Sequence, residues 1–284
     1  MKINRILPEN EQFLQGWDCI DPKPQALYSI GTLPEKRLKT VAIVGSRKTS
    51  AYGQEVTHKL AYDLAKQGIV IVSGLALGTD GMAHKAALEA GGLTIAVLAG
   101  GLDKIYPATH QSLAEQIIKQ NGTILSEYSA GTPHMQHRFL ERNRIVSGIS
   151  DAVIVVEAAS RSGTLATARW ALNQGKIVMA VPGNITNVNS VGCNRLIQQG
   201  AYVVTCAKDV LDTLGIEEKS QQTSLFAKNK EEKVILDLLQ RGVRDGDELR
   251  IQSQLPPEVY NQTLTMLEIN GMIRSLEGDQ WGIS

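Results

Sequence analysis

Glycines accompanied by serine, threonine or arginine follow the apolar segments of this chain, and these residue types are suited to binding an anion. They are Gly45, Ser46 and Arg47; Ser73, Gly74, Gly78, Thr79, Asp80 and Gly81; Gly100 and Gly101; Ser162, Gly163 and Thr164; and Pro182 and Gly183. Glycine lets backbone amides approach a phosphate, hydroxyls add donors, and arginine adds a charge-assisted bidentate contact. Any one of these glycines could simply close a tight turn, but loops of this kind converging on one sheet edge predict an anion site.

The basic residues make the prediction of an anion site more specific. Arg47 directly follows a buried strand, where packing does not explain a positive charge. The densest basic cluster is His137, Arg138, Phe139, Leu140, Glu141, Arg142, Asn143 and Arg144. On a helix running to Ile149, Arg138 and Arg142 share one face with Phe139 beside them, while Ile145 and Ile149 pack inward. Guanidinium groups for phosphates and a ring for a base suit an unpaired strand. The alternative is a solvated basic face with Phe139 in the core.

The sequence lacks the motifs of several common cofactor-binding and hydrolytic sites. The spacing of Gly74, Gly78 and Gly81 is not GxGxxG, and neither GxxxxGK[ST] nor GxSxG occurs, so we expect no cofactor. His84 could act as a base, although a structural or orienting role is the expectation. Asp80 either caps the helix that it opens or contacts the ligand.

The elements that position these loops alternate between strand and helix. The apolar runs VAIVG, IVIVSG, TIAVLAGG, TILSEY, AVIVVEA, IVMAVPG and AYVVTC predict strands buried on both faces, with amphipathic segments between them. This alternation predicts an α/β fold, an extended Rossmann-like, doubly wound and mainly parallel sheet, over residues 41–215. Residues 1–40 are predicted to be a leader packing on the sheet, and the polar residues 216–230 a linker. Three helices and a hairpin around Glu277, Gly278 and Asp279 predict a small winged-helix domain at residues 231–284.

Composition limits the class of protein. Hydrophobic residues make up 43% of the 284 residues, and the formal charge of 29 minus 29 is zero, so a nucleic-acid site must come from local clustering of basic side chains. Cys19, Cys193 and Cys206 match no metal or redox spacing and are expected to be reduced thiols. Neither a signal peptide nor an apolar run of about 20 residues is present, so we expect a cytoplasmic protein without a membrane partner.

The motifs together resemble a known family. VAIVGSR, SGLALGTDGMAH, LAGGLDKIYP, SEY, RFLERNRIVSG, VVEAASRSGTLATA and VPG occur in order, from about Asp21 to Leu214, and are similar to those of the DNA-processing protein A family, DprA or Smf. The resemblance implies a dimeric protein that binds and shields single-stranded DNA during natural transformation and helps to load RecA recombinase. It implies DNA contacts at Gly45, Ser46 and Arg47, at Gly74 and the loop to Asp80, and at Arg138, Phe139, Arg142, Asn143 and Arg144.

Two departures from the family are expected. A small helical domain that precedes the Rossmann part in many members has no room in residues 1–40, so contacts made by that domain are not expected here. The winged helix resembles a domain of only some members. Residues 228–284 hold seven Lys or Arg against ten Asp or Glu, and PPEVYNQTLTMLEIN has no basic residue, so a protein contact suits this domain better than reading DNA.

Two other functions compete with DNA binding. Nucleotide phosphoribohydrolases of the lysine-decarboxylase-like type resemble this fold and take a catalytic Glu from the motif PGGxGTxxE. Thr167 stands at that Glu position here, so a glycosidic bond would meet no acid or nucleophile there. The second alternative is a winged-helix transcription regulator whose Rossmann part senses a nucleotide, which the acidic helix disfavours.

Overall fold

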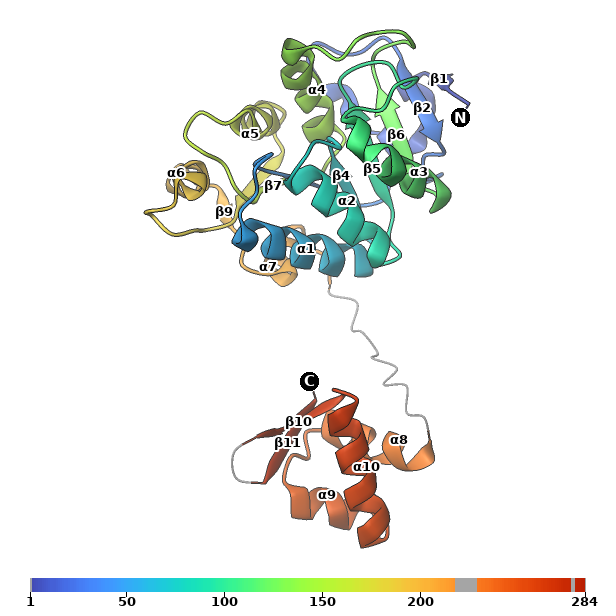
Figure 1. Ribbon diagram of the computed structural model, residues 1–284, viewed down its shortest axis with the longest axis vertical. Coiled ribbons are helices and arrows are strands. Elements are labelled where there is room, and N and C mark those ends of the chain that lie inside the picture. The colour runs from blue at the N-terminus through green and yellow to red at the C-terminus, as the bar shows by residue number, and fades with distance from the viewer. Residues whose placement is uncertain (1, 218–228, 277–278, 284) are drawn as a thin grey trace. The chain divides into compact units, whose positions relative to one another are not determined.

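The computed structural model describes residues 2–217, 229–276 and 279–283 (Figure 1). The chain divides into two units, residues 1–218 and 219–284. Most of the linker predicted at residues 216–230 lies outside the described residues, as do Glu277 and Gly278 of the predicted turn. Within the described ranges, no helix combines the length and apolar character needed to span a membrane.

A sheet of nine strands, counted over the described residues, forms the centre of the larger unit (Figure 1). Its order is β1-β2-β6-β5-β4-β3-β7-β8-β9. The strands are β1 (Asn4–Ile6), β2 (Leu27–Gly31), β3 (Thr40–Val44), β4 (Val70–Ser73), β5 (Thr94–Leu98), β6 (Thr123–Ser126), β7 (Ala152–Val155), β8 (Ile177–Ala180) and β9 (Tyr202–Val203). All pairings among β3 to β9 are parallel, which confirms the predicted doubly wound, mainly parallel sheet.

Residues 1–40, predicted to be a leader packing on the sheet, also contribute two strands to it. Strand β2 pairs antiparallel with β6, and β1 pairs antiparallel with β2. Between β1 and β2, three short 3₁₀ turns bury Phe13, Leu14 and Trp17 against the sheet; they are η1 (Pro8–Asn10), η2 (Gln12–Leu14) and η3 (Trp17–Cys19). These strands are three and five residues long, and β2 gains its partner from a segment about ninety residues away, so local pattern did not reveal them.

Helices cover both faces of the sheet. One face packs against α1 (Ala51–Lys66), α2 (Thr79–Glu89), α3 (Gln111–Lys119) and α7 (Ala207–Thr213), and the other against α4 (Gln136–Gly148), α5 (Thr164–Asn173) and α6 (Val191–Gln198). Two 3₁₀ turns, η4 (Ala108–His110) and η5 (Val188–Ser190), precede α3 and α6. Because side chains alternate along a strand, Val41 and Ile43 of β3 pack with α1, whereas Ala42 and Val44 pack with α4 and α5.

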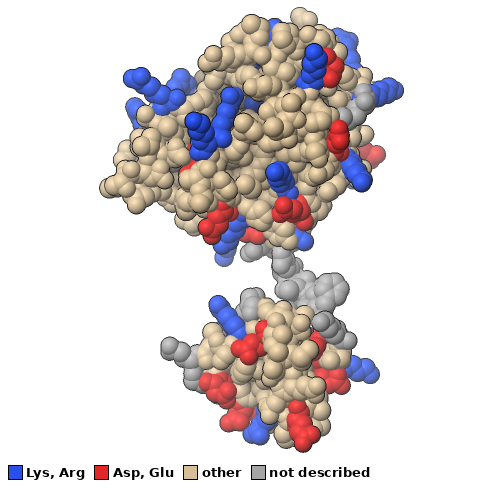
Figure 2. All heavy atoms as spheres, viewed as in Figure 1, with Lys and Arg blue, Asp and Glu red and all other residues tan. Residues whose placement is uncertain are grey.

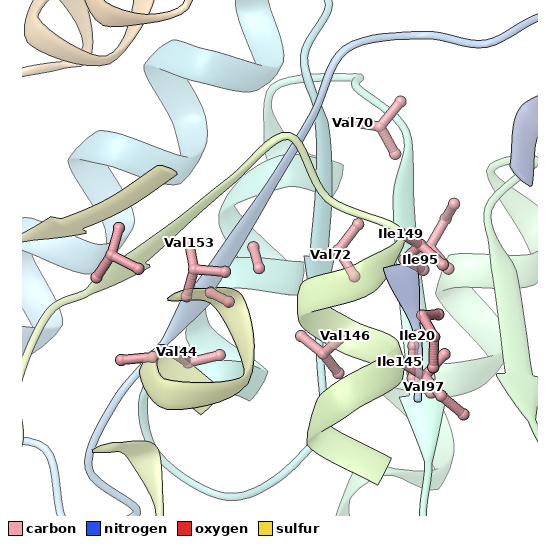
Figure 3. Close-up of a cluster of buried hydrophobic side chains, with 14 of the residues drawn as sticks. Ile20, Val44, Val70, Val72, Ile95, Val97, Ile145, Val146, Ile149 and Val153 are labelled. Carbon is pink, nitrogen blue, oxygen red and sulfur yellow. The ribbon is translucent and has the colours of Figure 1, made fainter. Parts of the chain in front are cut away.

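The core beneath α4 agrees with the prediction of a helix that runs to Ile149. Ile145 and Ile149 are 0% and 3% exposed, as predicted. Figure 3 shows them lying against Ile95 and Val97 of β5, with Ile20 from the N-terminal segment beside Ile145. The opposite face of α4 is thereby left at the surface.

The smaller unit has the predicted winged-helix elements. They are α8 (Lys230–Gln240), α9 (Gly246–Ser253), α10 (Pro257–Ile269), β10 (Ile273–Leu276) and β11 (Gln280–Ile283), the two strands being antiparallel. Asn229 and Asp245 cap α8 and α9, each accepting a backbone N–H from a glutamate three residues on. The Tyr260 hydroxyl donates to the Gly246 carbonyl at 2.8 Å and joins α10 to the start of α9.

The pairing of β2 with β6 can be tested at Gly31. This residue has φ +88°, and an added Cβ would lie 2.3 Å from the Gly122 carbonyl oxygen. Gly16 is the matched control, because it has φ +85° and no atom within 4 Å of such a Cβ. We expect Gly16→Ala to cost about 1–2 kcal/mol from the left-handed backbone alone. Gly31→Ala should cost about 1–3 kcal/mol more from the clash. Urea denaturation measures both, and equal losses would contradict the close β2–β6 approach.

Candidate nucleic-acid interface

The predicted anion site lies where the strand order reverses. Strand β3 has β4 on one side and β7 on the other, while the helices that follow β3 and β7 pack on opposite faces of the sheet. Ligands of doubly wound folds bind beyond the carboxyl ends of the strands at such a point. The loops that meet here are residues 45–50 after β3, 74–78 after β4 and 156–163 after β7. We call the surface that they form the loop crevice.

Hydrogen bonds between loops hold the crevice together. The Ser46 carbonyl accepts from the Thr49 hydroxyl at 2.7 Å and from the Thr79 backbone N–H at 3.2 Å. A Cβ at Gly78, where φ is +76°, would lie 2.3 Å from the same carbonyl oxygen, so this close approach requires glycine. Thr79 is buried and is therefore a structural part of the crevice.

The loop after β7 is joined to the first loop in the same way. The Thr164 hydroxyl donates to the Gly45 carbonyl at 2.9 Å, and the Ser162 hydroxyl donates to Thr164 Oγ1 at 3.0 Å. Gly163 is exposed, while Gly45, Ser46 and Ser162 are half-buried. The structure thus brings the three loops together, and the side chains of Thr79 and Thr164 serve the framework.

Arg47 is exposed at the crevice and reaches α4. Its Cζ lies 5.0 Å from the centre of the Phe139 ring, a cation–π contact between elements far apart in sequence. Phe139 is half-buried, so it belongs neither to the core nor to a fully solvated face. A guanidinium at the surface, supported by an aromatic ring beside glycine loops, has the chemistry needed to bind a phosphate group.

Arg142 lies beneath this surface. Its side chain is buried, and its Nη1 donates to the Gly74 carbonyl at 2.6 Å and to the Val97 carbonyl. Asp80 Oδ2 accepts the Gly74 N–H at 3.1 Å, so Gly74 is bound on both its polar groups. A Cβ at Gly74 would overlap the guanidinium, 2.4 Å from either terminal nitrogen. Arg142 and Asp80 therefore hold the loop after β4 in place, and Asp80 neither caps its own helix nor reaches the surface.

Burial shifts the pKa values of the titratable groups around Arg142. It raises the pKa of the Asp80 carboxyl, and the nearby Arg142 and backbone N–H groups offset part of that rise. Burial likewise lowers the pKa of Arg142 to about 10, which Asp80 opposes, so the guanidinium stays charged at neutral pH. Burial, followed by His110 and Arg142, lowers the pKa of His84 to about 3. His84 is 0% exposed and its Nδ1 lies 2.6 Å from Thr94 Oγ1, so it is a neutral structural residue.

The structure does not bring Arg144 to the crevice. Its guanidinium forms a buried ion pair with Glu127, 2.5 Å between Nη2 and Oε2, and also donates to the Pro22 and Glu141 carbonyls. With 5% of its surface exposed, Arg144 ties α4 to the N-terminal segment. The expectation that it contacts DNA is therefore corrected, because the helical repeat turns it away from the face that carries Phe139.

The remaining predicted residues of α4 lie near the surface. Arg138 is half-buried, with its Cζ 5.0 Å from the centre of the Tyr128 ring and its Nη1 bound to the Pro133 carbonyl. Asn143 is half-buried and accepts from Arg142 Nε at 3.2 Å. Arg138 therefore lies at the edge of the surface with its guanidinium held by Pro133 and Tyr128, and Asn143 supports Arg142.

Two aromatic residues beside Phe139 were missed by the sequence interpretation. Tyr106 and His134 follow β5 and β6, and their ring centres lie 5.3 Å apart. Tyr106 lies in the loop that contains Gly100 and Gly101, His134 lies just before the basic cluster, and only the tertiary structure joins the two rings to Phe139. Tyr106 belongs to the motif LAGGLDKIYP, in which no local signal marks the ring itself.

Comparison with known proteins finds a matching family model for each of the two units. A family model described as DNA recombination-mediator protein A matches residues 4–215, and one described as DprA winged helix domain matches residues 219–279. The chain is 39% identical over 269 residues to a putative DNA processing protein DprA of Mycobacterium tuberculosis. That match covers 92% of this chain and 69% of the mycobacterial protein.

Solved structures agree with this assignment. DNA processing protein A from Streptococcus pneumoniae superposes with a TM-score of 0.70 at 39% identity, over 75% of this chain and 74% of that one. DNA processing protein A from Helicobacter pylori, described for its single-stranded DNA binding mode, gives a TM-score of 0.66 at 34% identity, over 75% of this chain and 96% of that one.

The buried network predicts a pH-dependent loss of stability in Arg142→Met. The variant leaves the Asp80 carboxylate without its compensating cation, which should cost about 3–5 kcal/mol at pH 8. Because burial raises the folded-state pKa of Asp80, protonation of Asp80 favours the folded form, and that stability is present at low pH and lost as pH rises through the folded pKa. The loss relative to wild type should therefore be smaller at pH 5.

Urea denaturation at both pH values measures this difference. Arg195→Met, at an exposed arginine near the end of α6, is the matched control and should change stability by no more than about 0.5 kcal/mol. A loss from Arg142→Met that is the same at pH 5 and pH 8 would show that the coupling to Asp80 is not its source.

Proposed function

The chain belongs to the DNA recombination-mediator protein A family, and from this premise we propose that it binds single-stranded DNA at the loop crevice without performing chemistry on the strand. The exposed guanidinium of Arg47, 5.0 Å from the Phe139 ring at the mouth of the crevice, is the observation that carries this proposal. An unpaired strand offers both a phosphate for the guanidinium and a base face for a ring. Lys48, also exposed, adds a second positive charge to the same loop.

The proposed DNA surface is smaller than the set of residues first expected. Arg47, Phe139, Arg138 and the exposed backbone at Gly163 form the contact surface. Gly45, Ser46, Gly74, Gly78 and Thr164 shape it, and Asp80, Arg142 and Asn143 hold it from beneath. The single-stranded DNA binding described for the Helicobacter pylori protein supports the same ligand for this chain.

The proposed partners rest on the resemblance to the family. We propose that the protein protects incoming single strands during transformation and recombination, and that it helps to load RecA recombinase onto them, acting as a homodimer in the cytoplasm. The description of the matched family as recombination mediators supports this role. No cofactor enters the proposal, because binding to phosphates and bases needs none.

A phosphoribohydrolase activity is the enzymatic alternative, and the geometry gives it little support. Thr167, at the position of that family's catalytic Glu, is 2% exposed within α5. The Glu157 carboxylate, in the loop after β7, is buried and accepts from the Ser50 backbone N–H at 2.9 Å and the Ser50 hydroxyl at 2.5 Å, where it stabilises the start of α1.

We expect no free base when the protein is incubated with nucleoside monophosphates, because Thr167 replaces the catalytic Glu and the Glu157 carboxylate is engaged by Ser50. Chromatography of the products checks this. Steady release of base, proportional to enzyme concentration and lost in a variant of a crevice residue, would contradict a binding-only function.

The winged-helix unit does not favour sequence-specific duplex binding. Helix α10 carries Glu258 and Glu268 and has no lysine or arginine. Acidic side chains are prominent on the visible face of this unit (Figure 2). A helix that enters the major groove needs donors for phosphates and base edges. We therefore propose a protein-contact role for this unit, and preference for a defined duplex over oligo-dT in competition would contradict it.

Arg47→Glu should weaken binding to oligo-dT by about tenfold or more, because one phosphate contact is lost and a repulsion is added. Lys119→Glu makes the same change of charge at the end of α3, near the edge of the sheet where β6 begins, and should leave the affinity nearly unchanged. Fluorescence anisotropy over a range of salt concentrations checks this.

The salt dependence adds a second criterion. The slope of log affinity against log salt should become shallower by about 0.7 in Arg47→Glu, as expected for one phosphate of a single strand. Equal losses in Arg47→Glu and Lys119→Glu would indicate a long-range effect of net charge and would place the contact elsewhere.

A further inference from the structure

We propose that the ring of Tyr106 is a base-stacking contact, so that the DNA surface extends from the loop crevice onto the loops that follow β5 and β6. This inference rests on the proposed binding of single-stranded DNA and adds to it a residue on a different part of the sheet edge. The observation behind it is the exposed aromatic ring of Tyr106, which lies against Phe139, the residue whose ring Arg47 covers.

Three rings pack together at this place, and we call Tyr106, His134 and Phe139 the aromatic shelf. The centres of the Tyr106 and His134 rings lie 5.3 Å apart with 26° between their planes, a stacked arrangement. The centres of Tyr106 and Phe139 lie 5.6 Å apart with a tilt of 54°. His134 and Phe139 are stacked at 6.3 Å. The shelf thus joins the loops after β5 and β6 to α4.

The shelf has one exposed ring. Tyr106 is 48% exposed, whereas His134 and Phe139 are half-buried, and Arg47 already lies over the ring of Phe139. A tyrosine used only for packing would bury most of its ring, because burial of aromatic surface is what stabilises the fold. Tyr106 instead has a ring partner in His134 and retains a large surface open to solvent. That combination leaves a ring surface available to a base.

The loops that carry the shelf are joined by hydrogen bonds. The Gly101 N–H donates to the Thr132 carbonyl at 2.9 Å, and the Gly131 N–H donates to Asp103 Oδ1 at 2.7 Å. His134 Nε2 lies 3.0 Å from the Lys104 carbonyl oxygen. The platform is therefore ordered before any ligand arrives, so a stacked base would gain contact area without the entropic cost of ordering the loop.

Close packing fixes the ring that supports Tyr106. A Cβ at Gly100 would lie 2.7 Å from His134 Nδ1, so the glycine after β5 makes room for the imidazole. The pair Gly100 and Gly101, first considered as part of an anion-binding loop, thus serves the shelf instead. This accounts for glycines in a loop that lies outside the loop crevice.

The charges around the shelf suit a nucleic-acid strand. Arg47 lies at its Phe139 end, and Lys104, which is exposed, belongs to the loop that holds His134. Asp103, the acidic residue of this loop, is engaged by the Gly131 N–H. A base on Tyr106 would have cations nearby for its flanking phosphates. Every base has a π face, so stacking here would not depend on sequence, and a duplex would not offer a free base.

The test compares oligo-dT with an oligomer of equal length built from abasic deoxyribose phosphates, which has the same charge but no bases. The variants are Tyr106→Ala, Tyr106→Leu and Tyr106→Phe. Loss of a stacked base contact corresponds to about 5- to 150-fold weaker binding of oligo-dT. We expect this loss in Tyr106→Ala and to a similar extent in Tyr106→Leu, which keeps apolar cover for His134 but has no ring. Tyr106→Phe should retain the wild-type affinity, and binding of the abasic oligomer should be unchanged in all three.

The outcomes separate this inference from the function on which it rests. Wild-type binding of oligo-dT with no change in Tyr106→Ala would overturn the stacking role and leave the loop crevice as the DNA site. Equal losses for oligo-dT and the abasic oligomer would also overturn it, because the ring would then act on phosphate contacts or on the fold. Failure of the wild-type protein to bind oligo-dT would overturn the proposed function and this inference together.

Discussion

The buried guanidinium of Arg142 makes the interactions on which the arrangement of the loop crevice depends. It donates to the carbonyls of Gly74 and Val97, at the ends of β4 and β5, and is coupled to Asp80, which binds the Gly74 N–H. Removing a charged group from water is costly unless its hydrogen bonds are satisfied. These hydrogen bonds therefore fix α4 in position relative to the ends of β4 and β5. Phe139, three residues earlier on α4, is thereby placed where Arg47 can lie over its ring.

The arginines of this region divide between framework and surface. Arg142 and Arg144 are buried and tie α4 to the sheet and to the N-terminal segment, respectively. Arg47 is exposed and carries no ion pair among the described residues, so its charge is available to a ligand. Two of the three arginines in the basic cluster are therefore structural, and the exposed Arg47 comes from a loop about 90 residues earlier in the chain.

The threonines of the loops bond the loops together, and the glycines allow them to approach closely. Thr79 and Thr164 bond to backbone carbonyls of the first loop, while Gly74 and Gly78 permit approaches that a Cβ would block. The crevice is therefore preorganised, which lowers the entropic cost of binding. The Asp80 and Glu157 carboxylates take part in the same framework, because Asp80 accepts the Gly74 N–H and Glu157 accepts the Ser50 hydroxyl.

The sequence by itself determined the strands β3 to β9, the helices between them and the winged helix, because buried parallel strands are continuous apolar runs and helix ends carry their own caps and glycines. It also determined that the glycine loops share one edge, since parallel strands all end on the same side. Only the tertiary structure decided that β1 and β2 extend the sheet, because their pairing is between distant segments. It also decided that Arg144 faces Glu127 while Arg47 faces solvent, and that Tyr106, His134 and Phe139 share one surface. Burial and contact arise from neighbours far apart in the chain, and local periodicity carries no information about them.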